Sequence, residues 1–361
     1  MPPPRLMLAC AGLMLTCSPA LAEDAVAGDA KPTDDVLTKA EKSPWLLLPT
    51  FQGNPKLGAA FGALAGYMHY FDKQSRPSIF AVTAQYTSTD SVVGGLFAKT
   101  SFDRDHQRFL TGLAYGKIKN DYDDFLGTGV PLHNDAELKS LIARYTYRVQ
   151  GDWFIGGQGL YQDFAIDGDT DFDDAFMGIL GIAPFKTAGA GLVLQNDTRD
   201  NENMPTQGWL LNANNIFFRE GLGGDHDYEV YRLDLRYYLG HGNGHVLAFH
   251  QLNHLTDDAP GAARAPVQLR GYKVGQYTSR YMSSLEVEER FRFASKFTAS
   301  LFAGGGWLYG DERNTADDFY PAGGGGVQYI LKPKEGIVLN LEAALGKDDN
   351  YGFYLKLGYA F

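Results

Sequence analysis

Two groups of side chains have types and spacings that could bind a metal ion. His250 and His254 are four residues apart, the spacing of zinc ligands on a helix. In a β-strand, at ~3.3 Å per residue, they would lie about 13 Å apart, too far for one ion. The second group, which resembles a calcium-binding loop, consists of Asp167, Asp169, Asp171 and Asp173. Phe172 occupies the position where that loop needs glycine, and Gly178 the position where it needs glutamate. We therefore predict no metal site, and interpret the aspartate run as a solvated loop; the alternative is that it bridges lipopolysaccharide through divalent cations.

Neither a phosphate-binding loop nor a catalytic serine can be recognised. Residues 323–326 are four glycines, but no Gly-Lys-Ser/Thr follows them, so we interpret them as a bend in a strand. No serine lies in a nucleophile-elbow pattern. A serine–histidine pair without a motif is the one enzymatic alternative left open. The sequence predicts a protein that is not an enzyme and needs no cofactor.

The first 22 residues have the three parts of a secretory signal peptide. Arg5 is their only charge, residues 6–16 are apolar, and small residues at 20 and 22 precede a predicted cut after Ala22. Both cysteines, Cys10 and Cys17, lie in this segment, 1–22. The mature chain is therefore expected to form no disulfide and no thiolate metal site.

Composition narrows the class of protein further. The rest of the chain has no apolar run near the ~18 residues that a membrane-spanning helix needs, so any membrane residence must come from strands. Glycine (43 residues) and aromatic residues (13%) are abundant. Removing Arg5 from the 32 basic side chains leaves 31 against 43 acidic ones, a formal net charge of −12. We expect no nucleic-acid partner, which would need a basic stripe.

Residues 44–361 share one alternating pattern, which predicts a single domain. In the last segment the large apolar side chains of one face are Tyr351, Phe353, Leu355, Leu357, Tyr359 and Phe361. Residues 140–149 and 228–239 repeat the pattern, with arginines among the polar residues of the second face. An apolar face toward lipid and a small or polar face toward a lumen is typical of a transmembrane barrel, whereas a soluble sandwich would turn its apolar face inward.

Turn residues divide this domain into about sixteen strands. They are 45–52, 56–71, 77–88, 91–104, 107–119, 137–149, 152–167, 186–196, 206–219, 226–240, 243–256, 281–294, 296–310, 319–331, 335–346 and 351–361. The long connections all fall on the outer side if both ends of the domain are periplasmic. The sequence therefore predicts an all-β protein, a transmembrane antiparallel β-barrel of about 16 strands in a bacterial outer membrane. Residues 23–43 would form a flexible periplasmic or lumenal lead.

Several motifs follow one another between residues 268 and 361. They are Gln268-Leu269-Arg270-Gly271-Tyr272, the segment 281–293 with Glu288 and Arg290, Phe302-Ala303-Gly304-Gly305-Gly306, the glycine-rich segment 323–331 and the terminal Phe361. In this order they resemble the BamA/TamA superfamily of outer-membrane assembly and translocation barrels, the bacterial surface antigen family. Residues 197–201 and 205–209 are similar to a periplasmic turn of that family.

The resemblance implies that the loop with Arg270, Gly271 and Tyr272 folds back into the barrel. Its arginine would pair with acidic groups of the lumen wall, among them Glu288, which shares a strand face with Arg290. A confined guanidinium needs a carboxylate to offset its desolvation, and its planar fork suits one. Where the family has a second acidic partner this chain has Gly304, so we expect the loop to be held weakly. The alternative is that Arg270 is a solvated loop residue.

Relatives that insert or translocate proteins carry periplasmic POTRA domains. Only residues 23–44 separate the predicted cut from Trp45, too few for such a domain. The sequence is therefore identified as a member of the family lacking POTRA domains.

The first and last predicted strands indicate a weak joint between them, a lateral seam. Trp45, Leu47 and Pro49 lie on the first strand, and proline donates no ladder hydrogen bond and belongs at sheet edges. The last strand contributes Gly352 and Gly358. A weak seam would permit the lateral opening that the resemblance implies. An ordinary closed barrel with a frayed joint is the alternative.

The last residues look like the signal by which assembly machinery recognises outer-membrane clients. This signal comprises Lys356, Gly358, Tyr359 and Phe361. We expect the protein to be a client of that machinery and to contact outer-membrane lipid and lipopolysaccharide. Nascent membrane proteins or a periplasmic partner are further candidate partners.

The resemblance favours a barrel that assists protein or lipid insertion or translocation at the outer membrane through its lateral seam. The alternative is a passive pore or structural surface barrel without insertase activity. The missing POTRA domains and Gly304 favour that alternative.

Overall fold

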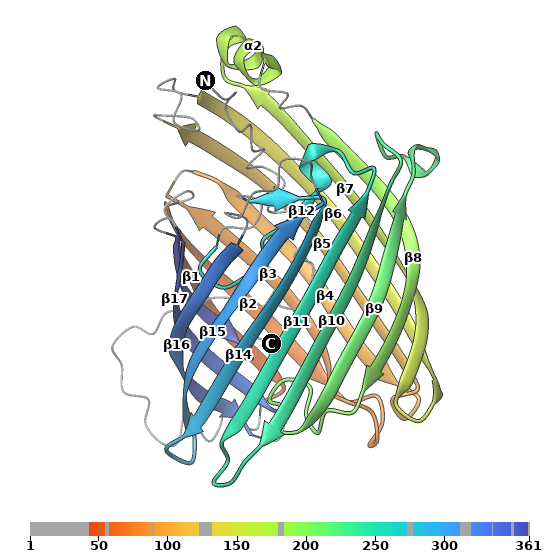
Figure 1. Ribbon diagram of the computed structural model, residues 1–361, viewed down its shortest axis with the longest axis vertical. Coiled ribbons are helices and arrows are strands. Elements are labelled where there is room, and N and C mark those ends of the chain that lie inside the picture. Colours follow the sequence, from red (N-terminus) through yellow and green to blue (C-terminus); the bar gives the residue numbers. More distant parts are fainter. Residues whose placement is uncertain are drawn as a thin grey trace.

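The computed structural model describes residues 43–54, 58–88, 90–122, 132–179, 184–272, 277–310, 319–333, 335–347 and 350–359. Sixteen antiparallel strands form a closed barrel (Figure 1), and each pairs with the next barrel strand along the chain. The strands are β1 (Trp45–Asn54), β2 (Gly58–His69), β3 (Ser78–Thr87), β4 (Val92–Phe102), β5 (Gln107–Tyr122), β6 (Leu132–Gln150), β7 (Trp153–Gly168), β8 (Phe185–Asp197), β9 (Gly208–Phe218), β10 (Tyr228–Gly240), β11 (Val246–Asp257), β14 (Tyr281–Arg292), β15 (Phe297–Tyr309), β16 (Phe319–Lys332), β17 (Ile337–Gly346) and β18 (Tyr351–Leu357). Among the described residues, no helix is both long and apolar enough to cross a membrane.

The fold class predicted from alternation is confirmed, and each predicted strand is present with ends shifted by a few residues. The structure adds short elements in the connections: α2 (Asp171–Ile179), η3 (Glu220–Leu222), η4 (Gly261–Ala263), and a two-stranded sheet of β12 (Ala265–Pro266) and β13 (Thr278–Ser279). Thr170 accepts a hydrogen bond from the N–H of Asp173 at 3.2 Å and so caps α2, and Asp171 and Asp173 of the aspartate run lie in the first turn of this helix. The predicted signal peptide and residues 23–42 lie outside the described residues.

The barrel has an apolar outer surface and a mixed interior. Leu192 and Leu301 are among its exposed outward side chains, as the alternation predicts for lipid-facing positions. In β18, Tyr351 and Phe353 are exposed as expected, whereas Leu355 is buried. We call the end with the short turns 103–106, 151–152 and 241–245 the periplasmic end, because short turns lie there in barrels of this class.

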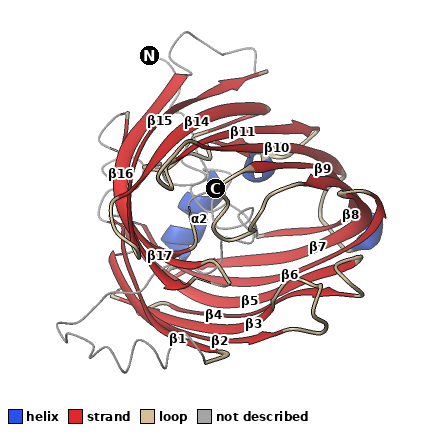
Figure 2. Ribbon diagram, turned by 90° about the horizontal axis from the view of Figure 1, so that it is seen from below, coloured by secondary structure: helices blue, strands red, loops and turns tan. Residues whose placement is uncertain are grey.

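The cross-section is elongated rather than round. Figure 2 shows β8 near one narrow end and β16 on the opposite side. Inside the β8 end, apolar side chains of β6 to β10 pack together with the loop residue Ala263; they are Ile142, Leu160, Phe185, Ile216, Phe218, Tyr228 and Val230. This part of the interior is therefore a packed core.

Candidate functional site: the loop anchor and the seam

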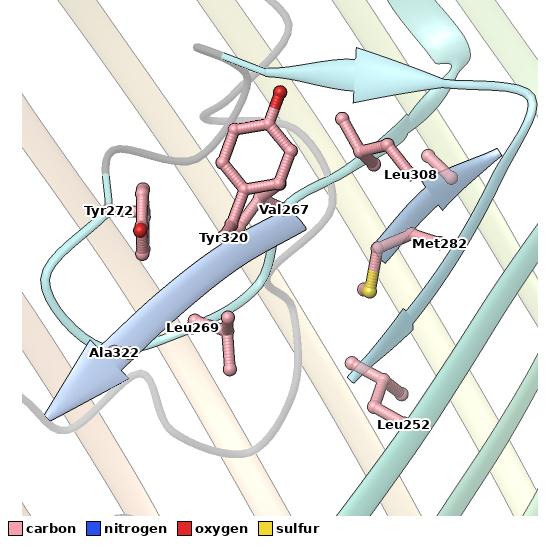
Figure 3. Close-up of a cluster of buried hydrophobic side chains, with 9 residues drawn as sticks. Leu252, Val267, Leu269, Tyr272, Met282, Leu308, Tyr320 and Ala322 are labelled. Atoms are coloured by element: carbon pink, nitrogen blue, oxygen red, sulfur yellow. The ribbon is translucent and has the colours of Figure 1, made fainter. Parts of the chain in front are cut away.

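The long connection between β11 and β14 enters the lumen and packs against its wall. Val267, Leu269 and Tyr272 of this loop are buried. They lie against side chains of β11, β14, β15 and β16 (Figure 3), namely Leu252, Met282, Leu308, Tyr320 and Ala322. Burial of a Leu- or Val-sized side chain stabilises by about 1.5–3 kcal/mol. This cluster therefore fixes the loop inside the barrel and carries Arg270 to the wall.

Arg270 is bound by three carboxylates from the lumen wall. Its Nε donates to Glu286 at 3.0 Å, and its Nη1 donates to Glu288 at 2.5 Å and to Glu342 at 2.8 Å. The guanidinium also lies over the ring of Phe302, 3.3 Å from its centroid. The loop arginine is thus a buried, paired cation, not a solvated residue.

Two glycines of the wall make room for the acids that hold Arg270. A Cβ on Gly304 would lie 2.7 Å from Cγ of Glu286, and one on Gly326 would lie 2.7 Å from Cγ of Glu342. The expectation that Gly304 leaves the arginine without a second acidic partner is wrong. Longer glutamates from β14 and β17 supply the charge, and they need the space above a glycine.

The tip of the loop is attached to the strands beside the seam. Gly271 has a φ of +90°, which favours glycine, and its N–H donates to the hydroxyl of Tyr354 in β18 at 2.9 Å. The Tyr272 hydroxyl donates to the carbonyl of Pro321 in β16 at 2.5 Å and accepts from the N–H of Lys347 at 2.7 Å. The loop therefore braces the C-terminal strands from inside.

Glu288 is shared by two arginines. Besides Arg270 it accepts from Nε of Arg290 at 2.6 Å. Arg290 is fully buried, and its Nη1 donates to the carbonyl of Pro205, in the β8–β9 connection, at 3.4 Å. Its guanidinium also lies 3.8 Å from the ring centroid of Tyr359. One carboxylate therefore connects the outer loop, a periplasmic turn and the end of the described chain.

The seam between β1 and β18 is thin. Its one described ladder pair joins Gly53 and Phe353, whereas every residue of β1 pairs with β2 and every residue of β18 pairs with β17. The predicted seam residues on these strands are Trp45, Leu47, Pro49 and Gly352. Trp45 and Leu47 are exposed, with Leu47 at 74%.

The end of β18 corrects the prediction for the C-terminal residues. The strand ends at Leu357, because Gly358 has a φ of +91° and its N–H donates to the carbonyl of Val338 at 2.6 Å. Tyr359, which alternation places on the lipid face, lies inside over an arginine of β14. Lys356 belongs to β18, and Phe361 lies outside the described residues. The role of this segment as an assembly signal stays a prediction.

A second ion-pair network, which the sequence analysis missed, lies at the periplasmic end. Residues 198–207, hereafter the β8–β9 turn, contribute Arg199, whose Nε is 2.8 Å from Asp197, and Glu202, which pairs with Lys99 of β4. Arg76 of the β2–β3 connection lies 2.7 Å from Asp197 and 3.7 Å from Glu202. The network joins this turn to the wall of β2 to β5.

The same network continues through Asp105 in the β4–β5 turn. Its carboxylate lies 2.7 Å from Arg108 of β5 and 2.7 Å from Arg148 of β6. Arg108 also reaches Asp197 at 3.2 Å. Burial opposes the ionisation of Asp105, but the neighbouring arginines and Ser101 outweigh it and lower the pKa of this carboxyl.

The two histidines of the apparent zinc spacing have separate surroundings. His250 lies 3.2 Å from a carboxylate oxygen of Asp234 and 3.9 Å from one of Glu286, and His254 is fully buried. Within the described ranges, no group of three or more His, Cys, Asp or Glu side chains could hold a metal ion.

Glu342 could have been found from the sequence. The other inward residues of β17 include Val338, Asn340 and Ala344, so a glutamate in this series is a single charge among small or neutral side chains. A charge placed at a lumen position of a strand indicates a buried partner. Glu202 left no comparable signal, because it lies in a turn, where alternation does not single out a charge, and Lys99 and Arg76 are far away in the sequence.

Comparisons with known proteins agree with this architecture. Residues 180–361 match the model of the Omp85 superfamily domain. The fold is similar to CdiB from Escherichia coli (12% identity, TM-score 0.62, covering 93% of this chain and 66% of that chain) and CdiB from Acinetobacter baumannii (11%, 0.57, 87% and 59%). It is also similar to BamA from Haemophilus ducreyi lacking POTRA domains 1-3 (12%, 0.56, 88% and 71%). This chain thus spans less than two thirds of either CdiB chain, and no curated protein matches its sequence.

Replacing Arg270 with alanine should release the loop and destabilise the barrel. The variant would leave Glu286, Glu288 and Glu342 facing one another, and removing one partner of a buried ion pair costs about 3–5 kcal/mol. The urea midpoint of protein folded in lipid vesicles measures the loss. Arg280→Ala is the control, because its pair with Asp257 is exposed and such pairs contribute about 0–1 kcal/mol. Equal losses in the two variants would contradict a special role for Arg270.

The stability contributed by Glu202 should depend on pH in a defined window. Burial opposes ionisation of this carboxyl, but Lys99, Arg76, Arg199 and Arg108 outweigh it and hold its pKa well below the usual range. A lowered folded pKa gives stability that is complete above the unfolded value, about 4.3, and is lost as pH falls through the folded value.

Urea midpoints of wild type and Glu202→Gln, measured from pH 3 to pH 8, should therefore differ by a constant amount down to about pH 5 and converge only below about pH 4. A difference that disappears between pH 7 and pH 5 would show that the carboxylate is not held by these cations.

Proposed function

Because this chain belongs to the Omp85 superfamily and is a bacterial outer-membrane protein, we propose that it assists the insertion or translocation of protein or lipid at the outer membrane through the seam between β1 and β18. The observation that carries the proposal is the single described ladder pair, Gly53 with Phe353, at this joint. A barrel joined so thinly at one place can part there at the lowest cost in backbone hydrogen bonds.

The two sides of the seam are held differently. On the C-terminal side, the loop tip binds Tyr354, Pro321 and Lys347, and Arg270 binds acids of β14 and β17. In the described part of this loop, Arg270, Gly271 and Tyr272 form their hydrogen bonds with residues of β14, of β16 to β18 and of the connection after β17. The C-terminal side is therefore braced, and parting the seam moves β1 away from a fixed edge.

An extended client segment suits the edge that such parting exposes. In the described structure, residues 45–52 of β1 pair with β2 alone. The other edge of this segment can therefore accept backbone hydrogen bonds. The turn at Gly358 contributes to this free edge, because it directs the chain end away from β1 and toward the lumen. Strand addition needs no cofactor and no covalent chemistry.

A passive pore or structural surface barrel is the alternative function. The loop anchored by Arg270 occupies part of the lumen and is held by three carboxylates and a packed apolar cluster. A passive pore does not require a loop that is bound so firmly to the strands beside its seam. The loop therefore counts against the pore.

Photocrosslinking in cells tests the proposal. A photoreactive residue at Leu47 in β1 or at Phe353 in β18 should capture nascent membrane proteins, because both side chains are exposed beside the seam. Leu192 is the matched control, since it is equally lipid-facing but lies on β8, far from the seam. Products confined to lipid at all three positions, or equal capture of clients at Leu192, would contradict insertion at the seam.

A further inference from the structure

The β8–β9 turn leaves the barrel wall and reaches strands on the other side of the periplasmic mouth. The Nδ2 of Asn203 donates to the carbonyl of Glu335, in the β16–β17 connection, at 3.0 Å. Pro205 accepts from Arg290 of β14 at 3.4 Å. Because β8 and β16 lie on opposite sides of the elongated cross-section (Figure 2), a turn that begins at β8 and contacts Glu335 passes across the mouth.

The turn is a preformed unit. Oδ1 of Asp200 accepts from the N–H of Asn201 at 2.9 Å and of Thr206 at 2.9 Å, so one side chain joins both arms of the turn. Oδ1 of Asn201 accepts from the N–H groups of Asn203 and Met204, each at 2.9 Å. Such a segment keeps its shape through its own hydrogen bonds, so it can move as a body when its outer contacts break.

Those outer contacts are mostly charged. Glu202 pairs with Lys99 and lies 3.7 Å from Arg76. Lys99 belongs to β4 and Arg76 to the β2–β3 connection, so neither is part of the turn. Glu202 is therefore the acidic side chain by which the turn is attached to the cationic wall of β2 to β4.

We propose that the β8–β9 turn is a plug that closes the periplasmic mouth of the lumen, and that the attachment of Glu202 to Lys99 and Arg76 keeps it closed. The proposal concerns the lumen and does not depend on insertion at the seam. Two groups of contacts hold the plug at its far side, Asn203 with Glu335 and Pro205 with Arg290, and Glu202 holds it at the near side.

The charged side chains that remain on the wall determine which ions could pass through an open periplasmic mouth. When the turn withdraws, the wall retains Arg76, Lys99, Arg108 and Arg148 against Asp105 and Asp197, with Asp152 half-exposed at the rim. A constriction lined by an excess of cations attracts anions and excludes cations. The open state should therefore be anion-selective.

Conductance of the folded protein in planar lipid bilayers tests the plug. Wild type should be closed for most of the time, and Glu202→Gln should raise the open fraction about tenfold, which corresponds to 1.4 kcal/mol of lost closure. Glu202→Lys should raise it further, because it adds repulsion from Lys99 and Arg76. Glu229→Gln is the control, since it removes a carboxylate that pairs with Arg219 at the opposite end of the barrel.

Chemical closure provides the second measurement. The variant carries Asn203→Cys and Glu335→Cys in addition to Glu202→Gln. Joining the two cysteines with a short, cleavable thiol crosslinker should return the channel to the closed level. Cleaving the crosslinker should reopen it. The only native cysteines, Cys10 and Cys17, lie in the predicted signal peptide and would not interfere.

Four results would overturn the proposal, three from the conductance of the variants and one from the crosslinking. The first three are a steadily open wild-type pore, equal open fractions for Glu202→Gln, Glu202→Lys and Glu229→Gln, and an opened channel that prefers cations. A crosslinked channel that still conducts would likewise place the conducting path away from the turn.

Discussion

The arrangement inside the barrel depends on one electrostatic interaction, the pairing of a buried guanidinium with carboxylates. Arg270 sits inside the lumen, where an unpaired cation would be very costly, and Glu286, Glu288 and Glu342 offset that cost from two strands. The acids in turn need cations, and Arg270 serves all three of them, while Arg290 also pairs with Glu288. This mutual dependence fixes the loop against the wall, and the apolar cluster around Leu269 and Tyr272 adds to it.

The constraint extends beyond the loop because Glu288 serves a second arginine. Arg290, which pairs with Glu288, also donates a hydrogen bond to Pro205 at the periplasmic end and lies over the ring of Tyr359 after the last strand. Loop, turn and chain end therefore meet around two side chains of β14. At the seam, the C-terminal strands are braced, whereas β1 is joined to β18 by one described ladder pair. This asymmetry supports the proposal that the barrel parts at the seam.

The strands were predictable because one face of the barrel wall contacts lipid and the other faces a lumen. Apolar and polar side chains therefore alternate along each strand, and the type of each residue indicates which face it lies on. The identity of a buried charge's partner on a distant strand leaves no such local signal. Gly304 suggested a weakened anchor, but the structure uses the space above it for Glu286. The apolar alternation through Tyr359 predicted a longer last strand, yet Gly358 adopts a left-handed conformation and ends it. Arg270 and Glu288 were assigned through resemblance to a family, while Glu202 and Lys99, which pair across the interior, were not recognised.

Hydrogen exchange of wild type and Arg270→Ala in lipid vesicles tests whether Arg270 holds the C-terminal strands and the periplasmic turn together. If it does, the variant should exchange faster in β16 to β18 and in the β8–β9 turn, as well as in the loop itself, with β5 to β7 unchanged. Faster exchange confined to the loop, with β16 to β18 and the turn as protected as in wild type, would contradict this role of Arg270.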